Sequence, residues 1–295
     1  MTLAEKIERI CLMEATARKP GNVHPAAAFC DLRYEDFVAA AQAIAAPLAN
    51  AADVGVGRAI FQAVQATRVS TGTNVNLGIV LLLAPLAAVP RHHKLESGIG
   101  KLLCRTSIEE TVWVYDAIRL AQPGGLGEAS SQDIRDRPTV TLTEAMRLAA
   151  GRDRIAEQYV TDFRLVFEAR QKLCERLNQG SDWEHAIVWL SIWIMSRWPD
   201  TLIARKCGQT LAQEASERAA VLLVTAEQGG HFDPSALAAF DVWLRADGHR
   251  RNPGTTADLV AAALFAAMRD DLIPAPKLAD IQQRAEAIRA EAVTL

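Results

Sequence analysis

The stretch RNPGTTADLVAAALFAAM, Arg251 to Met268, decides the fold class, because it joins a polar turn to a run of almost uninterrupted apolar residues. A helix that is apolar on every side must lie buried in the middle of a protein. The polar turn has two explanations. Thr255 can cap the helix, with Asp258 as the acidic partner of a capping box. Alternatively, the free N–H groups at the helix N-terminus can bind a phosphate or a metal–phosphate complex.

The rest of the chain shows helical spacing between glycines and prolines, and alanine and leucine are abundant. Helices are predicted at residues 2–18, 35–49, 54–68, 107–121, 141–150, 152–178, 182–197, 235–247 and 276–292, in the apolar stretch that begins near Thr71 or Thr73, and after Pro199. Only PTVTL, residues 138–142, resembles a strand. We therefore expect an all-α fold, a single compact domain over residues 1–295, with roughly ten to thirteen helices of ordinary length.

The bulk composition narrows the class of protein. Of 295 residues, 50% are hydrophobic, which is enough to bury a large core. A net charge of −3 lacks the basic footprint of a nucleic-acid binder, and the apolar run Leu77–Val89 is too short to span a membrane. The five cysteines are scattered and contain no C-x-x-C pair, which is typical of reduced thiols in a cytoplasmic protein. A homodimer is an arrangement that these data leave open.

Polar residues interrupt the helical pattern where packing does not require them. Glu14 falls on the apolar stripe formed by Leu3, Ile7 and Ile10, where a carboxylate needs a partner. Lys19 follows in the turn KPGN. A lysine beside such a turn can hold a phosphate, or it can simply end the helix with a favourable charge. Both explanations stay open for this unit.

Four other stretches have the same character. Small polar residues crowd STGTNVN, residues 70–76, although one helix cap needs only one of them, and the spacing is not that of a Walker loop. Three glycines precede Glu128, and Asp200 stands at a helix start with Arg205 and Lys206 a turn further on. The turn of residues 251–258 is the fourth. Together these stretches predict that several helix ends meet at one pocket, whose carboxylates and cations suit a Mg²⁺–polyphosphate ligand.

The ordered series E-A-T-A-R-K-P-G-N, S-T-G-T-N-V-N-L-G, P-G-G-L-G, D-R-I-A-E-Q-Y, D-T-L-I-A-R-K-C-G and N-P-G-T-T-A-D-L resembles the triphosphoribosyl-dephospho-CoA synthase family over about residues 5–268. The resemblance implies an all-α enzyme that uses ATP as a ribosyl donor. In that reaction a hydroxyl of dephospho-CoA attacks the anomeric carbon of the ribose, adenine leaves, and the triphosphate stays on the product.

Roles for individual residues follow from motif position and polar placement. We expect Glu14 or Asp258 to stabilise the oxocarbenium-like state and to accept the proton of the hydroxyl. Asp200 and Glu128 are the predicted Mg²⁺ ligands. Lys19, with Arg205 as a second choice, is predicted to bind phosphate, and Asn74 and Thr71 to orient ribose or phosphate. The remaining predicted binding residues are Gly21, Asn22, Lys206, Asn252, Gly254 and Thr255.

The chain also departs from the family pattern. Most members carry a His-Lys pair after the asparagine of the second motif, where this chain has Val75-Asn76-Leu77. It resembles a divergent branch found in one-carbon cofactor settings, which implies that the acceptor can instead be a pterin-linked ribitol hydroxyl of a methanopterin-type cofactor. A Mg²⁺-dependent nucleotide hydrolase or phosphotransferase, and a helical binding protein without activity, are the other two hypotheses.

Overall fold

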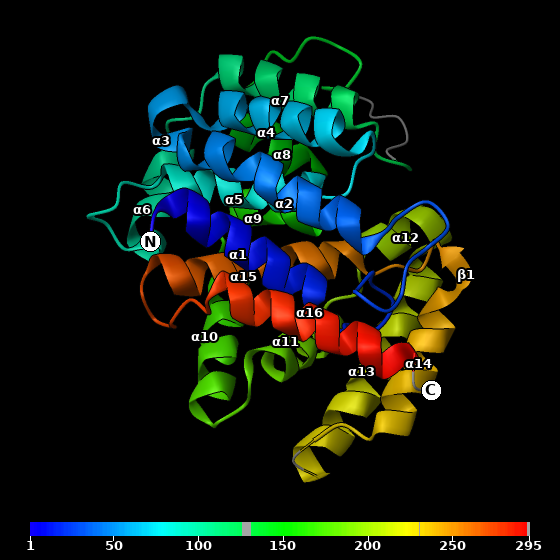
Figure 1. Ribbon diagram of the computed structural model, residues 1–295. Coiled ribbons are helices and arrows are strands. Elements are labelled where there is room, and N and C mark those ends of the chain that lie inside the picture. The colour runs from blue at the N-terminus through cyan, green and yellow to red at the C-terminus, as the bar shows by residue number, and fades with distance from the viewer. Residues whose placement is uncertain (126–130, 230, 294–295) are drawn as a thin grey trace.

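The computed structural model describes residues 1–125, 131–229 and 231–293 and shows a helical protein (Figure 1). The fold class is as expected, but these residues form 16 helices, more than the ten to thirteen predicted. The helices are α1 Leu3–Thr16, α2 Tyr34–Ala49, α3 Ala51–Val54, α4 Val56–Thr71, α5 Leu77–Ala88, α6 Leu95–Leu103, α7 Ile108–Ala121, α8 Leu142–Ala149, α9 Arg154–Val160, α10 Arg164–Asn178, α11 Trp183–Arg197, α12 Thr201–Cys207, α13 Gln209–Gly229, α14 Pro234–Arg245, α15 Gly254–Arg269 and α16 Leu278–Val293.

The higher count has local causes. The helix predicted over 152–178 is broken between α9 and α10, where Asp162 and Phe163 both have positive φ. The helix after Pro199 is likewise divided into α12 and α13 at Gly208, whose φ is 93°. The short helices α3 and α6 were not predicted. PTVTL is not a strand but leads into α8; the one strand among the described residues is β1, Ala246–His249.

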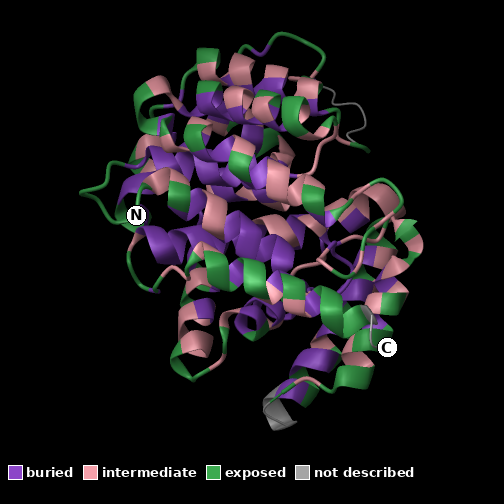
Figure 2. Ribbon diagram, in the orientation of Figure 1, coloured by how far each residue is buried: buried purple, intermediate pink, exposed green. Residues whose placement is uncertain are grey.

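Helix α15 is the centre of the molecule, as its sequence predicts. It contacts α1, α5, α10 and α11, and every residue from Leu259 to Arg269 is buried (Figures 1 and 2). Its many alanines let these neighbouring helices pack closely against it, since interhelical distance depends on the size of the side chains at the contact. The prediction of a fully buried helix is therefore confirmed.

The start of α15 is stabilised differently from the predicted capping box. Helix α15 begins at Gly254, and no side-chain cap is formed by the residue before it. Instead, one oxygen of Asp200 accepts hydrogen bonds from the backbone N–H (2.7 Å) and the hydroxyl (2.8 Å) of Thr256. The other oxygen accepts from the N–H groups of Leu202 (2.8 Å) and Ile203 (3.1 Å) in α12. A single carboxylate thus caps two helices and joins them.

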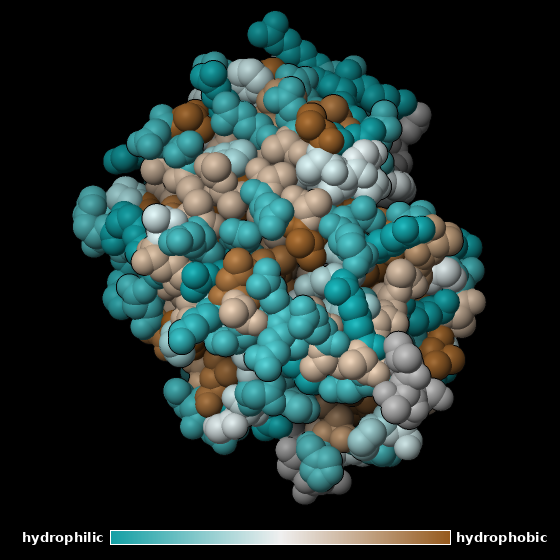
Figure 3. All heavy atoms as spheres, in the orientation of Figure 1, coloured by the Kyte–Doolittle hydropathy of each residue, from teal (hydrophilic) through white to brown (hydrophobic). Residues whose placement is uncertain are grey.

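Both hydrophilic and apolar side chains lie on the surface. The face shown in Figure 3 carries hydrophilic side chains interspersed with smaller apolar areas. In the part of the chain that the structure describes, no helix combines the length and apolar character needed to cross a bilayer.

Candidate functional site

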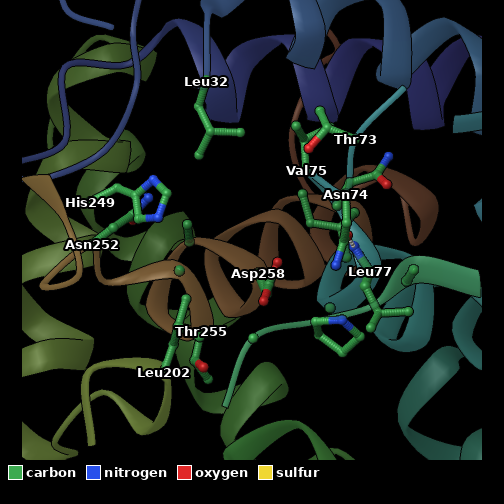
Figure 4. Close-up of a pocket in the computed structure, with 18 of the residues that line it drawn as sticks. Leu32, Thr73, Asn74, Val75, Leu77, Leu202, His249, Asn252, Thr255 and Asp258 are labelled. Atoms are coloured by element: carbon green, nitrogen blue, oxygen red, sulfur yellow. Dashed lines mark hydrogen bonds between the residues drawn. The ribbon is translucent and has the colours of Figure 1, made fainter. Parts of the chain in front are cut away.

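A cavity of about 450 Å³ lies where the C-terminal end of α1, the turn before α5 and the N-terminal ends of α9, α12 and α15 meet (Figure 4). These elements are far apart in the sequence, so the predicted convergence of helix ends is observed. Nine of the predicted site residues line the cavity: Glu14, Asn22, Asn74, Arg205, Lys206, Asn252, Gly254, Thr255 and Asp258. Lys19, Gly21, Thr71 and Asp200 are not among its lining residues. Glu128 lies outside the described residues.

Glu14 enters the cavity wall from the last turn of α1 and is paired with Lys19. The Nζ atom of Lys19 lies 2.9 Å from Oε1 of Glu14 and also donates to the backbone carbonyls of Glu14 and Ala17. Only 1% of the Lys19 residue surface is exposed, and these three acceptors match the three N–H donors of an ammonium group. Lys19 therefore lies behind Glu14, not in the position predicted for a phosphate ligand.

Asp258 reaches the cavity from the second turn of α15, directly opposite Gly78 of α5. A Cβ atom placed on Gly78 would lie 2.0 Å from Oδ2 of Asp258, so only glycine leaves room for this carboxylate. Asp258 accepts no hydrogen bond from the residues that the structure describes. Burial raises its pKa well above the usual range, and the nearby charges of Glu14, Asp200 and Asp153 add to the effect, against a smaller opposing effect of Arg205.

Three of the predicted residues have structural roles. Both oxygens of Asp200 are used in capping, and the residue is only 2% exposed, so direct Mg²⁺ coordination does not fit its bonding. The hydroxyl of Thr71 donates to the carbonyls of Thr67 (2.9 Å) and Thr73 (3.0 Å) and thereby closes the turn before α5. Gly21 has φ of 77° and packs against Leu244.

The cations of the cavity come from two helices. Arg68 lies in the last turn of α4, and Arg205 and Lys206 lie at the end of α12. The guanidinium of Arg205 is 3.5 Å from Oδ2 of Asp153, and its buried Nε atom has no hydrogen-bond partner among the residues that the structure describes. Burial lowers the pKa of Lys206, and the charge of Arg205 lowers it further. This end of the cavity can therefore attract an anionic ligand.

Amide side chains shape the rest of the wall. Nδ2 of Asn22 donates to Oδ1 of Asn252 over 2.7 Å and ties the turn after α1 to the turn before α15. Oδ1 of Asn74 accepts from the N–H of Leu77 and so holds the first turn of α5. Figure 4 shows Asn74, Asn252, Thr255 and Asp258 around the same space.

The cavity also contains Asp31, Arg68 and Asp153, for which the sequence predicts no role. Asn76, from the polar stretch 70–76, and His249, a weak candidate for substrate contact that directly precedes the last motif, line the cavity as well. Asp153 opens the D-R-I-A-E-Q-Y motif and caps α9 through Oδ1, which accepts from the N–H of Ile155 over 2.8 Å. In the sequence this aspartate cannot be told from an ordinary helix cap. His249, the last residue of β1, and Asp31, before α2, lie 2.9 Å apart, a contact that no local sequence pattern signals.

A smaller cavity of about 160 Å³, lined mainly by apolar residues of α7, α8 and α9, adjoins the first. The two cavities share Leu81, Ile118, Asp153 and Ile155 in their walls. Polar groups around the smaller cavity are largely satisfied within the protein; the hydroxyl of Tyr115, for example, donates to the carbonyl of Gln132 over 2.6 Å. This space is suited to an apolar group.

Metal-binding groups are sparse in the described ranges. No set of three or more His, Cys, Asp or Glu residues there is arranged to hold a metal ion. A site built only from protein ligands is thus not found in those ranges. Mg²⁺ commonly binds through one or two carboxylates together with substrate phosphates and water, which needs no such set.

Comparisons with known proteins agree with the motif series. The model of the ATP:dephospho-CoA triphosphoribosyl transferase family matches residues 1–276. A crystal structure of a candidate triphosphoribosyl-dephospho-CoA synthase from Archaeoglobus fulgidus has the same fold, with a TM-score of 0.64 and 24% identity over 80% of this chain and 100% of that chain. No curated protein matches the chain. The family match confirms the resemblance, and the chain belongs to the ATP:dephospho-CoA triphosphoribosyl transferase family of enzymes.

Proposed function

We propose that this transferase uses ATP as a ribosyl donor and moves its 5-triphosphoribosyl group to a hydroxyl of 3′-dephospho-CoA, with release of adenine. The family match supports the reaction type. The single observation that carries the site assignment is that Glu14 and Asp258 line one cavity in opposite environments. A cation holds Glu14, whereas Asp258 faces other carboxylates and has no hydrogen bond from the described residues.

The triphosphate is assigned to the cationic end of the cavity, at Arg68, Arg205 and Lys206. The same cavity contains several carboxylates, so a tetravalent anion needs a metal ion to enter it. Asp153 fits as the protein ligand of a Mg²⁺ ion that arrives with the triphosphate, because among the described residues Arg205, at 3.5 Å, is the one polar partner of its Oδ2 atom. When bound, the ion neutralises phosphate charge. Asp200 and Glu128 are not needed for this proposal.

The acceptor hydroxyl forms a bond to C1′ of the ribose while the C1′–N9 bond to adenine breaks. Glu14 accepts the hydroxyl proton, and its negative charge stabilises the oxocarbenium-like state. Asp258, whose pKa is raised by burial and by the neighbouring carboxylates, is the carboxyl group of the cavity suited to hold a proton. It donates that proton to the departing base, so adenine leaves as a neutral molecule. Two carboxyl groups in different environments thereby act as base and acid.

The apolar part of the acceptor is assigned to the smaller cavity, whose lining is mainly apolar. The arm of dephospho-CoA and a pterin ring both carry hydrogen-bonding groups, so this space can receive only an apolar part of either acceptor. Ala145 of α8 lies in its wall. An Ala145→Phe variant should raise KM for the acceptor and leave KM for ATP unchanged. Equal changes in both constants would argue against this assignment.

The decisive experiment measures free adenine from purified protein with ATP, Mg²⁺ and dephospho-CoA, followed by parallel reactions with pterin-linked ribitol acceptors. Formation of ADP or AMP without adenine would establish hydrolysis or phosphoryl transfer instead. We expect Glu14→Gln and Asp258→Asn each to lower kcat by roughly 10²–10⁴-fold, the usual contribution of a general acid or base. Glu217→Gln on the exposed face of α13 is the matched control. Unchanged turnover in both site variants would remove these assignments.

A further inference from the structure

Lys19 is the most deeply buried lysine of the described chain, and its position differs from that of a substrate ligand. The residue is 1% exposed and is not among the residues that line the cavity. Glu14, 3% exposed, is part of the cavity wall, and its Oε1 atom contacts the Nζ atom of Lys19. A phosphate in the cavity would therefore meet the Glu14 carboxylate before it could reach the ammonium group.

The bonding of Lys19 is complete without a ligand. Its Nζ atom donates to the carboxylate of Glu14 at 2.9 Å and to two backbone carbonyls at the end of α1. The same residue begins the turn in which Asn22 N–H donates to the carbonyl of Lys19 over 3.1 Å. Lys19 thus fixes both the end of α1 and the direction of the Glu14 side chain.

Glu14 lies close to other acidic groups. Asp258 of α15 is within its electrostatic reach, and so is Cys11, one turn earlier on α1. Asp153 and Arg205 line the same cavity. Lys19 is the cation that contacts Glu14 directly, and removing one partner of a buried ion pair leaves an uncompensated charge.

We infer that Lys19 is a positioning residue, which holds the Glu14 carboxylate in place at the cavity wall so that it can accept the proton of the acceptor hydroxyl. This inference rests on the proposed role of Glu14. It assigns the lysine of the KPGN motif to proton transfer through its neighbour and not to phosphate binding. Lys19 itself touches no substrate.

The test compares Lys19→Met with the wild-type protein in two measurements. Together they distinguish a lysine that positions Glu14 from a lysine that binds phosphate. In titration calorimetry with inorganic tripolyphosphate and with ATP, each in the presence of Mg²⁺, the Kd of Lys19→Met should stay within about threefold of the wild-type value. In the adenine-release assay its kcat should fall at least tenfold at pH 7, and the pH profile of kcat should differ from that of the wild-type protein, because Glu14 has lost the cation that it contacts. Lys101→Met, on the exposed side of α6, is the matched control.

The double variant Lys19→Met/Glu14→Gln guards against a simple folding defect. Removing one partner of a buried ion pair leaves an uncompensated charge, whereas removing both charges does not. The melting temperature should therefore fall in Lys19→Met and rise again in the double variant. A tenfold or larger loss of tripolyphosphate affinity, with an unshifted pH profile, would overturn the inference. Failure of the wild-type protein to release adenine would refute the proposed function instead, while the calorimetry and melting data would still test the position of Lys19.

Discussion

Gly78 of α5 and Asp258 of α15 face each other so closely that an added Cβ atom on Gly78 would lie 2.0 Å from the carboxylate oxygen. Helices α5 and α15 are far apart in the sequence, and they can approach each other in this way only because Gly78 has no side chain. The Cβ would also meet Cδ1 of Ile155 at 2.6 Å. Asp258 cannot stay in place if Gly78 is replaced.

Gly78→Ala should accordingly lower kcat by more than tenfold and cost about 1–3 kcal/mol of stability, the usual cost of inserting a methyl group into packed surroundings. Steady-state adenine release and urea unfolding measure the two effects. Gly151→Ala is the control, because a Cβ added there would meet no atom of the described residues within 4 Å, apart from its own chain neighbours. A Gly78→Ala variant with full activity would show that the Asp258 carboxylate is not needed in its observed position.

The raised pKa of Asp258 predicts a specific pH dependence of stability. Its folded pKa lies well above the ordinary value of 3.8. The native state consequently holds a proton that the unfolded state has lost, and this contribution to stability is complete below pH 3.8 and falls as pH rises through the folded pKa. Asp258→Asn removes the titrating group, so the stability of this variant relative to wild type should increase with pH above about 4.

Urea unfolding at a series of pH values measures this difference. Comparing two proteins that differ only at residue 258 cancels contributions from other acidic groups, including Asp200, whose pKa is also raised by burial. A stability difference that does not change with pH would mean that Asp258 is already ionised in the folded protein.

The buried centre of the fold and the location of the site could be predicted from sequence, for identifiable reasons. A helix such as α15, with apolar residues on all sides, has only one stable environment. The five polar clusters at helix ends contain more polar residues than helix capping requires, and this surplus indicates a shared cavity. Nine of the predicted residues, Glu14 and Asp258 among them, do line it.

The roles of individual side chains within the clusters could not be predicted in the same way. Lys19 and Glu14 belong to one motif, but the motif does not state which of them faces the cavity and which lies behind. Asp200 was expected at a helix start, and its bonds to Thr256 on a second helix depend on tertiary packing alone. The helix breaks at Asp162 and Phe163, which both have positive φ. Residues other than glycine rarely adopt this conformation, and no glycine stands there to indicate the break.

Asp200 provides a prediction about stability. Replacing it with alanine leaves three backbone N–H groups and the hydroxyl of Thr256 without their acceptor. We expect Asp200→Ala to destabilise the protein by about 2–4 kcal/mol, since a lost cap costs roughly 1 kcal/mol and a buried unsatisfied group 1–3 kcal/mol. Asp182→Ala, which removes the partly exposed cap of α11 alone, should cost only about 1 kcal/mol.

Chemical denaturation of both variants tests this difference, and activity as a function of Mg²⁺ concentration supplies a second readout. If Asp200 only caps helices, the Mg²⁺ concentration for half-maximal activity should be unchanged in Asp200→Asn. A large increase in that concentration without loss of stability would instead support metal binding by this carboxylate.

Asn76 carries a buried polar atom that the protein itself does not satisfy. Its Oδ1 atom accepts a hydrogen bond from the hydroxyl of Thr67 over 3.1 Å, but its Nδ2 atom has no partner in the described part of the chain, and the residue is 5% exposed in the wall of the cavity. An unsatisfied buried donor costs about 1–3 kcal/mol, whereas replacing both members of a hydrogen-bonded pair by apolar groups is close to neutral or stabilising.

The double variant Thr67→Val/Asn76→Leu should therefore match or exceed the wild-type melting temperature. Asn76→Leu alone should be less stable than the double variant, because it leaves the Thr67 hydroxyl without its acceptor. Differential scanning calorimetry distinguishes these outcomes. If the double variant is destabilised by more than either single change, Nδ2 of Asn76 must have a partner in solution, and the turn before α5 must then be arranged differently from the structure described above.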